Sequence, residues 1–464
     1  MSQLSSTKNL SAVIAASSVG TLIEWYDFYI FGSLATVIAT KFFPAGNPTL
    51  ALLSTLATFA AGFVVRPFGA LFFGRLGDLV GRKYTFLLTL VLMGLSTFLI
   101  GCIPGYQTIG YLAPILVLVL RLLQGLALGG EYGGAATYVA EHAPVGKRGY
   151  WTSWIQTTAT VGLFLSLLVI ISVKANLSKE DFADWGWRIP FWISIIMVGI
   201  SIVIRLRMQE SPLFTAAKKS GAISSSPLRD SFANKYNFKF VLLALLGATM
   251  GQGVVWYTGQ FYALNFLQNT LKLDVAQASQ LIMVALLFAT PFFVFFGWLS
   301  DKIGRKWIML TGMLLAVICY RPIYAAMYEI GIAAAGGTLT SGLLLDDASF
   351  WKMVRLVFFQ VLFVTMVYGP IAAFLVELFP TRIRYTSMSL PYHVGNGIFG
   401  GLLPAIATYL STRAIQANEI AVKTGVAVPY EKPYLEGLWY PIVIASISFI
   451  IGAIYIQEKK NQIE

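Results

Sequence analysis

The sequence predicts an all-α membrane protein with about twelve transmembrane helices in two similar halves, and three observations carry this prediction. Of the 464 residues, 57% are apolar and only 12% are charged, whereas soluble domains carry about 25% charged residues. Apolar runs of roughly 20 residues, the length that crosses a bilayer, recur along the whole chain. Basic residues gather in alternate loops between these runs. Together these features exclude a water-soluble protein.

The apolar runs define the expected helices in order. They cover residues 12–40, 50–73, 84–103, 111–140, 151–174, 187–206, 240–269, 278–299, 307–331, 353–379, 385–411 and 437–457. A basic, Ser-rich stretch is the one long polar segment between them, and it divides the runs six and six. We therefore expect an N-terminal six-helix half at 1–206, a cytoplasmic linker at 207–239 and a C-terminal six-helix half at 240–464.

The net charge of +12 describes topology and not nucleic-acid binding. About 20 of the 33 Lys and Arg lie in alternate loops, counting those from Arg205 to Lys239 as one loop, and the remaining loops hold about half as many. Cytoplasmic loops of membrane proteins carry this excess of basic residues. The asymmetry predicts that both termini are cytoplasmic.

A loop motif occurs twice, after the second and after the eighth expected span. Residues 74–83 and 297–306 both read G-x-L-x-D-x-x-G-R-K. Glycines permit tight turns, and the Asp can accept from helix amides or pair with a basic neighbour. The repeat resembles the signature loop of the major facilitator superfamily. That resemblance implies the major facilitator fold, with two pseudo-symmetric halves and a substrate site near the membrane midplane.

Three further stretches narrow the resemblance. They are E-W-Y-D-F-Y at 24–29, R-L-L-Q-G with G-G-E-Y-G-G at 121–134, and W-G-W-R-I-P-F at 185–191. Together they are similar to the metabolite:proton symporter family, whose members carry organic acids, zwitterionic osmolytes and related small polar metabolites into bacteria. The resemblance implies a multi-pass protein of the bacterial inner membrane that uses a proton as coupling ion and no other cofactor. Because one chain would hold a complete two-half cavity, we expect a monomer with a small anionic or zwitterionic substrate.

Two acidic residues of the first span are candidate proton carriers. An ionised side chain deep in a bilayer is costly, so each one needs a reason. Glu24 and Asp27 are three residues apart and share one helix face, and two carboxylates that close do not both ionise easily. Asp27 is favoured over Glu24 as the carrier, with Arg121 as its counter-ion, since related sugar:proton porters place an Arg there. The alternative is a structural ion pair that locks the first and fourth spans.

Other charges inside spans leave more than one interpretation open. Glu131, among glycines, is a candidate for a second protonation site, a substrate ligand or a packing-network acid. Arg66 precedes Pro67, so it either contacts carbonyls freed by the proline, which we favour, or binds an anionic substrate. Arg321, also followed by proline, poses the same question with a weaker functional case.

Polar and aromatic residues of several spans are candidates for substrate contact. Gln252, Trp256 and Gln260 recur at a spacing of four, which places them on one helical stripe. The superfamily resemblance places parts of spans 1, 4, 5, 7, 8, 10 and 11 around the cavity. The further candidates on these spans are Arg121, Tyr26, Trp154, Gln156, Tyr392, His393 and Asn396. The competing interpretation is packing or interface anchoring, with His393 neutral and hydrogen-bonded.

Charged residues at the cytoplasmic loops are candidates for gating. Glu141 and Arg148 after the fourth span are echoed by Glu377 and Arg384 after the tenth. We expect them to form ion-pair networks with the repeated loop motif that hold in one state and break in another. The motif residues in this set are Gly74, Asp78, Arg82, Asp301 and Arg305.

These features favour a secondary transporter that imports a small polar solute, a carboxylate by preference, together with a proton. The buried arginines favour a carboxylate. A drug:proton antiporter of the same fold is the alternative, although the fifth span lacks the G-x-x-x-G-P element usual in such exporters. A nutrient sensor is a remote alternative. The sequence contains no Cys/His metal spacing, no phosphate-binding loop and no nucleophile elbow, so we do not expect an enzyme.

Overall fold

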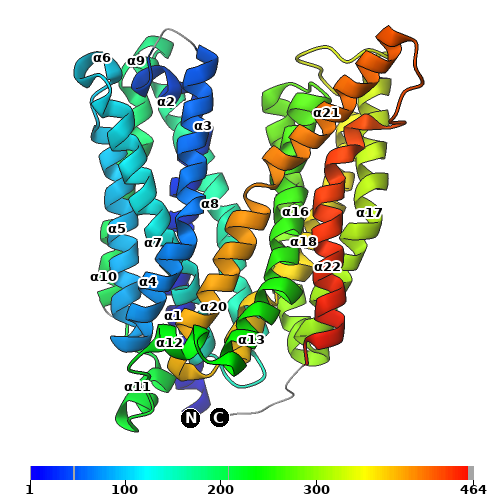
Figure 1. Ribbon diagram of the computed structural model, residues 1–464. Helices are drawn as coiled ribbons and strands as arrows, with labels where there is room; N and C mark the ends of the chain where they lie inside the picture. The colour runs from blue at the N-terminus through cyan, green and yellow to red at the C-terminus, as the bar shows by residue number, and fades with distance from the viewer. Residues whose placement is uncertain (1, 45–47, 207, 458–464) are drawn as a thin grey trace. The chain divides into compact units, whose positions relative to one another are not determined.

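The computed structural model describes residues 2–44, 48–206 and 208–457. Within these ranges every regular element is a helix, and one isolated bridge joins Leu273 to Leu343. The protein is therefore all-α, with the helix order drawn in Figure 1.

Most long helices begin and end within about six residues of the predicted spans, but α1 begins at Ser2 and not at residue 12, and α21 continues to Thr424, beyond the predicted end at residue 411. Those up to the linker are α1 (Ser2–Ser33), α2 (Ala35–Phe42), α3 (Pro48–Val64), α4 (Arg66–Leu79), α5 (Arg82–Cys102), α6 (Tyr106–Ile109), α7 (Leu112–His142), α8 (Arg148–Asn176), α9 (Lys179–Asp184) and α10 (Ile189–Leu206). The remaining ones are α11 (Pro212–Lys219), α12 (Pro227–Phe232), α13 (Lys235–Ala244), α14 (Met250–Tyr257), α15 (Ala263–Asn265), α16 (Val275–Ile303), α17 (Arg305–Ala334), α18 (Asp347–Tyr368), α19 (Ile371–Leu378), α20 (Arg384–His393), α21 (Leu403–Thr424) and α22 (Trp439–Tyr455).

Ten helical segments of the described chain are long and apolar enough to cross a membrane, and they match the expected spans three to twelve. The expected first span falls on α1, and the expected second span is divided at Val65 into α3 and α4, which have 17 and 14 residues. Pro67 at the start of α4 explains this division, because proline cannot continue the hydrogen bonding of a preceding helix.

By internal contacts the chain forms two compact units. Among the described residues, the first comprises those up to Val241 together with Leu375–His393, and the second comprises Leu242–Phe374 together with 394–457. The predicted halves at 1–206 and 240–464, with 375–393 in the C-terminal half, describe the order of spans along the chain and stay a prediction. In the structure α20 runs beside α4 and α7 and belongs to the first unit (Figure 1).

Small residues bring α4 and α7 into backbone contact. A Cβ on Gly69 would lie 2.0 Å from the carbonyl oxygen of Leu126, and one on Gly129 would lie 2.2 Å from that of Arg66. In a membrane, where burial of apolar surface drives little association, such close approach supplies the packing energy. The glycine run at 129–134 therefore contributes to close packing of α7 against α4.

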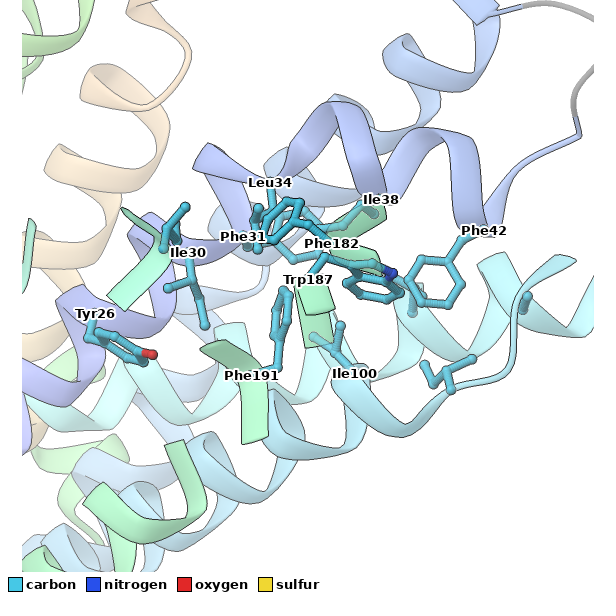
Figure 2. Close-up of a cluster of buried hydrophobic side chains, with 14 residues drawn as sticks. Tyr26, Ile30, Phe31, Leu34, Ile38, Phe42, Ile100, Phe182, Trp187 and Phe191 are labelled. Carbon is cyan, nitrogen blue, oxygen red and sulfur yellow. The ribbon is translucent and has the colours of Figure 1, made fainter. Parts of the chain in front are cut away.

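An aromatic cluster holds α1, α5, α7 and α10 together in the first unit, and Figure 2 shows it. The Trp187 ring meets Phe42 and Phe191 edge-on at 5.5 and 6.0 Å between centroids. Tyr26 belongs to this cluster, is 0% exposed and donates its hydroxyl to the Pro190 carbonyl at 2.7 Å. This geometry favours packing as the role of Tyr26, because its one donor is already used by the backbone, and the predicted substrate contact stays a prediction.

The seventh span is not a uniform α-helix. Three π-turns, at Leu245–Thr249, Thr258–Tyr262 and Phe266–Thr270, interrupt it, and a fourth, Val394–Gly400, separates α20 from α21. Each π-turn inserts a residue into the helical repeat. The predicted stripe at a spacing of four consequently holds from Gln252 to Trp256 and shifts at Gln260, which lies in the second π-turn.

Candidate functional site

A chain of hydrogen bonds leads to the buried carboxylate of Asp27 on α1. Thr97 of α5 donates to Asp27 Oδ2 at 2.7 Å, and Gln124 of α7 donates its amide to the Thr97 hydroxyl at 2.6 Å. Arg121 in turn donates to the Gln124 carbonyl oxygen. Asp27 Oδ1 is buried without a hydrogen-bond partner in the described chain. The expected direct ion pair between Asp27 and Arg121 is not formed, because two polar side chains stand between them.

Glu24 and Arg66 lie in the same unit without an ion pair of their own. Glu24 is buried, and its Oε2 has no hydrogen-bond partner in the described ranges. Arg66 is half-buried, with its guanidinium carbon 4.2 Å from the centroid of the Phe63 ring. The favoured contact of Arg66 with carbonyls freed by Pro67 does not occur among the described residues, since the guanidinium stacks on an aromatic ring instead.

Glu131 pairs with a residue that sequence reasoning placed outside the membrane core. Arg205 Nη2 lies 2.6 Å from Glu131 Oε1, and each side chain is 1% exposed. Thr89 donates to the other carboxylate oxygen at 2.7 Å, and the Arg205 guanidinium lies 3.4 Å from the Phe86 ring centroid. Arg205 was counted with the cytoplasmic loop charges, which is wrong for its side chain. Of the three interpretations of Glu131, this geometry favours the packing-network acid.

A second cluster joins α7, α8 and α20. The rings of Tyr132 and Tyr392 stack in parallel at 3.7 Å, and Gln156 donates to the Tyr132 hydroxyl at 2.8 Å. His393 meets the Tyr392 ring edge-on at 5.1 Å and has a buried Nε2 without a partner in the described part of the chain. Trp154, by contrast, is 40% exposed on α8. The structure thus gathers Gln156, Tyr392 and His393 and leaves Trp154 outside the cluster.

The second unit carries its own polar group. Gln252 and Asn396 exchange two amide hydrogen bonds of 3.1 and 2.9 Å. Trp256 packs against Phe261 and Tyr368, with ring centroids 5.4 and 6.3 Å apart. Gln260 is buried in the π-turn that follows.

An ion-pair network of the first unit connects the loop motif with α7 and α20. Arg82 lies 2.9 Å from Asp78 and 3.6 Å from Glu141, and Arg384 lies 2.9 Å from Glu141. Asp78 also accepts from the backbone amide of Thr386 at 2.9 Å. Sequence reasoning predicted this set of charges, and the structure places four of its members in one network.

The other gating candidates are distributed as follows. A Cβ on Gly74 would lie 2.9 Å from the backbone of α20, so this glycine permits close approach. Asp301 and Arg305 pair at 2.7 Å within the second unit, Arg148 donates to the Ala140 carbonyl at 3.2 Å, and Glu377 is exposed.

Three polar residues of the first unit were missed by sequence reasoning. Thr97 and Gln124 form the chain to Asp27, and Glu210 accepts from the first backbone amide of α5, that of Arg82, at 3.1 Å. The spacing of Gln124, three residues from Arg121 on one helix face, was the available signal. In the described ranges no group of three or more His, Cys, Asp or Glu could hold a metal ion.

Comparison with known proteins places this chain among transporters. It is 33% identical over 447 residues to the alpha-ketoglutarate permease of Escherichia coli (strain K12), which covers 96% of this chain and 93% of the relative. It is 34% identical over 405 residues to the citrate-proton symporter of Klebsiella pneumoniae, covering 86% and 85%. It is 32% identical over 412 residues to the proline/betaine transporter of Escherichia coli (strain K12), covering 86% and 78%.

The fold has a solved counterpart in the major facilitator proton:xylose symporter XylE. The two share a TM-score of 0.66 at 15% identity, over 96% of this chain and 95% of the other. The family described as sugar (and other) transporter matches residues 12–454. The helices, the repeated loop motif and these comparisons agree, and the chain belongs to the sugar (and other) transporter family of the major facilitator superfamily.

Proposed function

We propose that this transporter imports a small carboxylate together with a proton by alternating access. Arg66 binds a carboxylate of the substrate, and Asp27 carries the proton. The observation that supports this proposal most strongly is a half-buried arginine in a membrane unit that forms no ion pair among the described residues, with Glu24 acting on it only from beyond ion-pair distance.

The buried and half-buried arginines of the first unit differ in their partners, and Arg121 donates to the Gln124 carbonyl oxygen. Arg82, Arg205 and Arg384 each lie within 3.6 Å of a carboxylate oxygen. Arg66 has an aromatic ring on one face and no ion pair in the described ranges. A cation inside a membrane protein is costly unless an anion meets it, and a guanidinium binds a carboxylate through two parallel hydrogen bonds. A substrate carboxylate would supply a directly bound anion, which Glu24 does not provide from its greater distance.

Asp27 suits the proton because it is buried, carries one unpartnered oxygen and has no ion pair in the described chain. A buried carboxylate without a counter-ion is more stable when it is protonated. We therefore propose that protonation of Asp27 accompanies the conformational change of the transport cycle. A membrane potential of about 100 mV supplies about 2.3 kcal/mol per proton, which corresponds to an accumulation of about 50-fold for a neutral solute.

The test is uptake into proteoliposomes under an imposed inward proton gradient, with and without a protonophore. The solutes are labelled α-ketoglutarate, citrate, proline and glycine betaine. We expect gradient-driven accumulation of a carboxylate that the protonophore abolishes. Arg66→Gln should raise KM about 10- to 100-fold, the loss expected for a charge-assisted hydrogen bond. The matched control is Arg75→Gln, which removes an exposed arginine from the same helix and should leave KM unchanged.

Outcomes of this panel separate the alternatives. A zwitterionic osmolyte is the second candidate, because one relative is a proline/betaine transporter and the second unit presents the Trp256 aromatic group that could receive a cationic ammonium. Accumulation of proline or glycine betaine in preference to both carboxylates would overturn the carboxylate assignment. Efflux driven by the proton gradient, with no uptake of any of the four solutes, would favour an antiporter.

Two further parts of the proposal concern topology and assembly. We propose cytoplasmic termini, as the distribution of basic loops predicts, and a functional monomer. A membrane-impermeant thiol reagent should fail to label cysteines introduced near the termini of the protein in intact cells. Cross-linking in proteoliposomes should leave the protein at the mass of one chain.

A further inference from the structure

We propose that Thr97 and Gln124 are positioning residues that fix where Asp27 holds the transported proton. Together with Arg121 they form a hydrogen-bond chain of one polarity, which occupies Oδ2 of Asp27 as an acceptor and leaves Oδ1 to take up and release the proton. This inference rests on the proposed role of Asp27 in proton coupling.

The polarity follows from the chemistry of the first member. A guanidinium has donors and no acceptor, so the Gln124 atom that meets Arg121 must be its carbonyl oxygen. The amide group of Gln124 then points at Thr97 and donates to the hydroxyl oxygen at 2.6 Å. The hydroxyl has a single hydrogen left to donate onward.

That hydrogen has two possible acceptors, and the geometry favours one. Asp27 Oδ2 lies 2.7 Å from the Thr97 hydroxyl oxygen, whereas the Met93 carbonyl oxygen lies at 3.1 Å. Hydrogen bonds to an ionised acceptor are the shorter and stronger kind. Every link of the chain therefore donates toward Asp27, and the unpartnered Oδ1 is the atom with free lone pairs.

The hydrogen-bond chain is the main polar connection between Asp27 and the neighbouring helices. Arg121 of α7 acts on it electrostatically from beyond ion-pair distance, and Glu24 and Tyr26 are the titratable neighbours on its own helix. From α5 it receives Thr97, which does not titrate. The hydrogen-bond chain thus links Arg121 to the carboxylate and leaves Oδ1 of Asp27, which is buried, without a hydrogen-bond partner in the described chain.

The arrangement has a function in proton release. The hydrogen bond from Thr97 stabilises the ionised form of Asp27, so a carboxylate without it releases its proton less readily. Exchange of substrate across the membrane requires no proton release, whereas net uptake does. Loss of the chain should therefore slow net uptake and spare exchange, a pattern that a purely structural defect would not produce.

The first test needs no substrate. Infrared difference spectra of the reconstituted protein between acidic and alkaline pH should contain a protonated carboxyl C=O band that disappears in Asp27→Asn. That band should move to higher wavenumber in Thr97→Val, because its carbonyl oxygen loses a donor, and return in Thr97→Ser. Gln124→Glu should reproduce the Thr97→Val shift, because a carboxylate only accepts and turns the Thr97 hydroxyl away from Asp27. The control is Ser96→Ala, whose hydroxyl donates to the Leu92 carbonyl of its own helix.

The second test compares gradient-driven uptake with exchange of α-ketoglutarate or citrate. We expect net uptake to fall about 10-fold or more in Thr97→Val and Gln124→Glu, with exchange within about 2-fold of the parent. An unmoved C=O band in both variants, or equal loss of uptake and exchange, would overturn the positioning role. Absence of the Asp27 band in the parent protein at every pH would instead refute the proton-carrier assignment, so the two failures are distinguishable.

Discussion

Removing one charge of the buried Glu131–Arg205 pair should destabilise the protein strongly. The two groups lie 2.6 Å apart at 1% exposure, with Thr89 and the Phe86 ring completing the environment. Glu131→Gln keeps the shape of the side chain and abolishes its charge. The Arg205 guanidinium would then remain buried without a counter-ion.

The magnitude follows from the burial of both partners. Breaking a buried pair on one side costs about 3–5 kcal/mol, because an uncompensated charge stays behind. Glu131→Gln and Arg205→Gln should each cost this much, whereas the double variant leaves two neutral amides able to hydrogen-bond to each other. We therefore expect the double variant to cost less than the sum of the singles by about 3 kcal/mol.

The assay is unfolding in mixed micelles of increasing SDS content, followed by tryptophan fluorescence. The matched control is the Arg321–Glu436 pair of the second unit, which is longer at 3.3 Å and 29% and 22% exposed. Arg321→Gln should cost about 0–1 kcal/mol, as partly solvated pairs do. The reasoning would be refuted if either single variant of the Glu131–Arg205 pair lost no more stability than Arg321→Gln. It would also be refuted if the stability losses of the two single variants simply added up in the double variant.

Three other substitutions test the packing. Gly69→Ala places a Cβ 2.0 Å from the Leu126 carbonyl oxygen and should separate two helices at a cost of about 1–3 kcal/mol, measured by the same SDS titration. Tyr26→Phe should cost about 1 kcal/mol through the lost hydrogen bond to the Pro190 carbonyl and leave KM for substrate unchanged, measured by titration and by uptake. Arg384→Gln leaves Glu141 with Arg82, at 3.6 Å, as its remaining guanidinium partner and should cost about 1.5–3 kcal/mol, the loss of one charge-assisted hydrogen bond, again by SDS titration.

The spans were predictable from sequence because lipid imposes a length and a composition on each one. The loop motif was predictable because it occurs twice. The pairing of Arg205 was not, since an arginine at the end of an apolar run looks like one whose head reaches the interface. Its side chain instead turns inward over Phe86 to reach Glu131. This orientation depends on the position of α7, which carries Glu131.

Two features of the site depend on geometry that a single sequence does not display. The direction in which Gln260 leaves the helix is set by a π-turn, and π-turns have no simple residue signature. The distance between Asp27 and Arg121 is set by how far apart α1 and α7 lie, and at that separation Thr97 and Gln124 fit between them. The sequence identified Asp27 and Arg121, the two ends of this hydrogen-bond chain, but not the two residues between them.

Charge arithmetic constrains the proposed transport cycle further. A monocarboxylate that enters with one proton moves no net charge, so the membrane potential neither helps nor hinders it. A dicarboxylate with one proton would carry a net negative charge inward against about 2.3 kcal/mol at 100 mV, and a second proton removes that penalty. The first unit contains two buried carboxylates without an ion pair in the described chain, Asp27 and Glu24. If the substrate proves to be a dianion, we therefore expect Glu24→Gln to lower the number of protons taken up per solute from two to one, while for a monoanion the same substitution should leave that number unchanged.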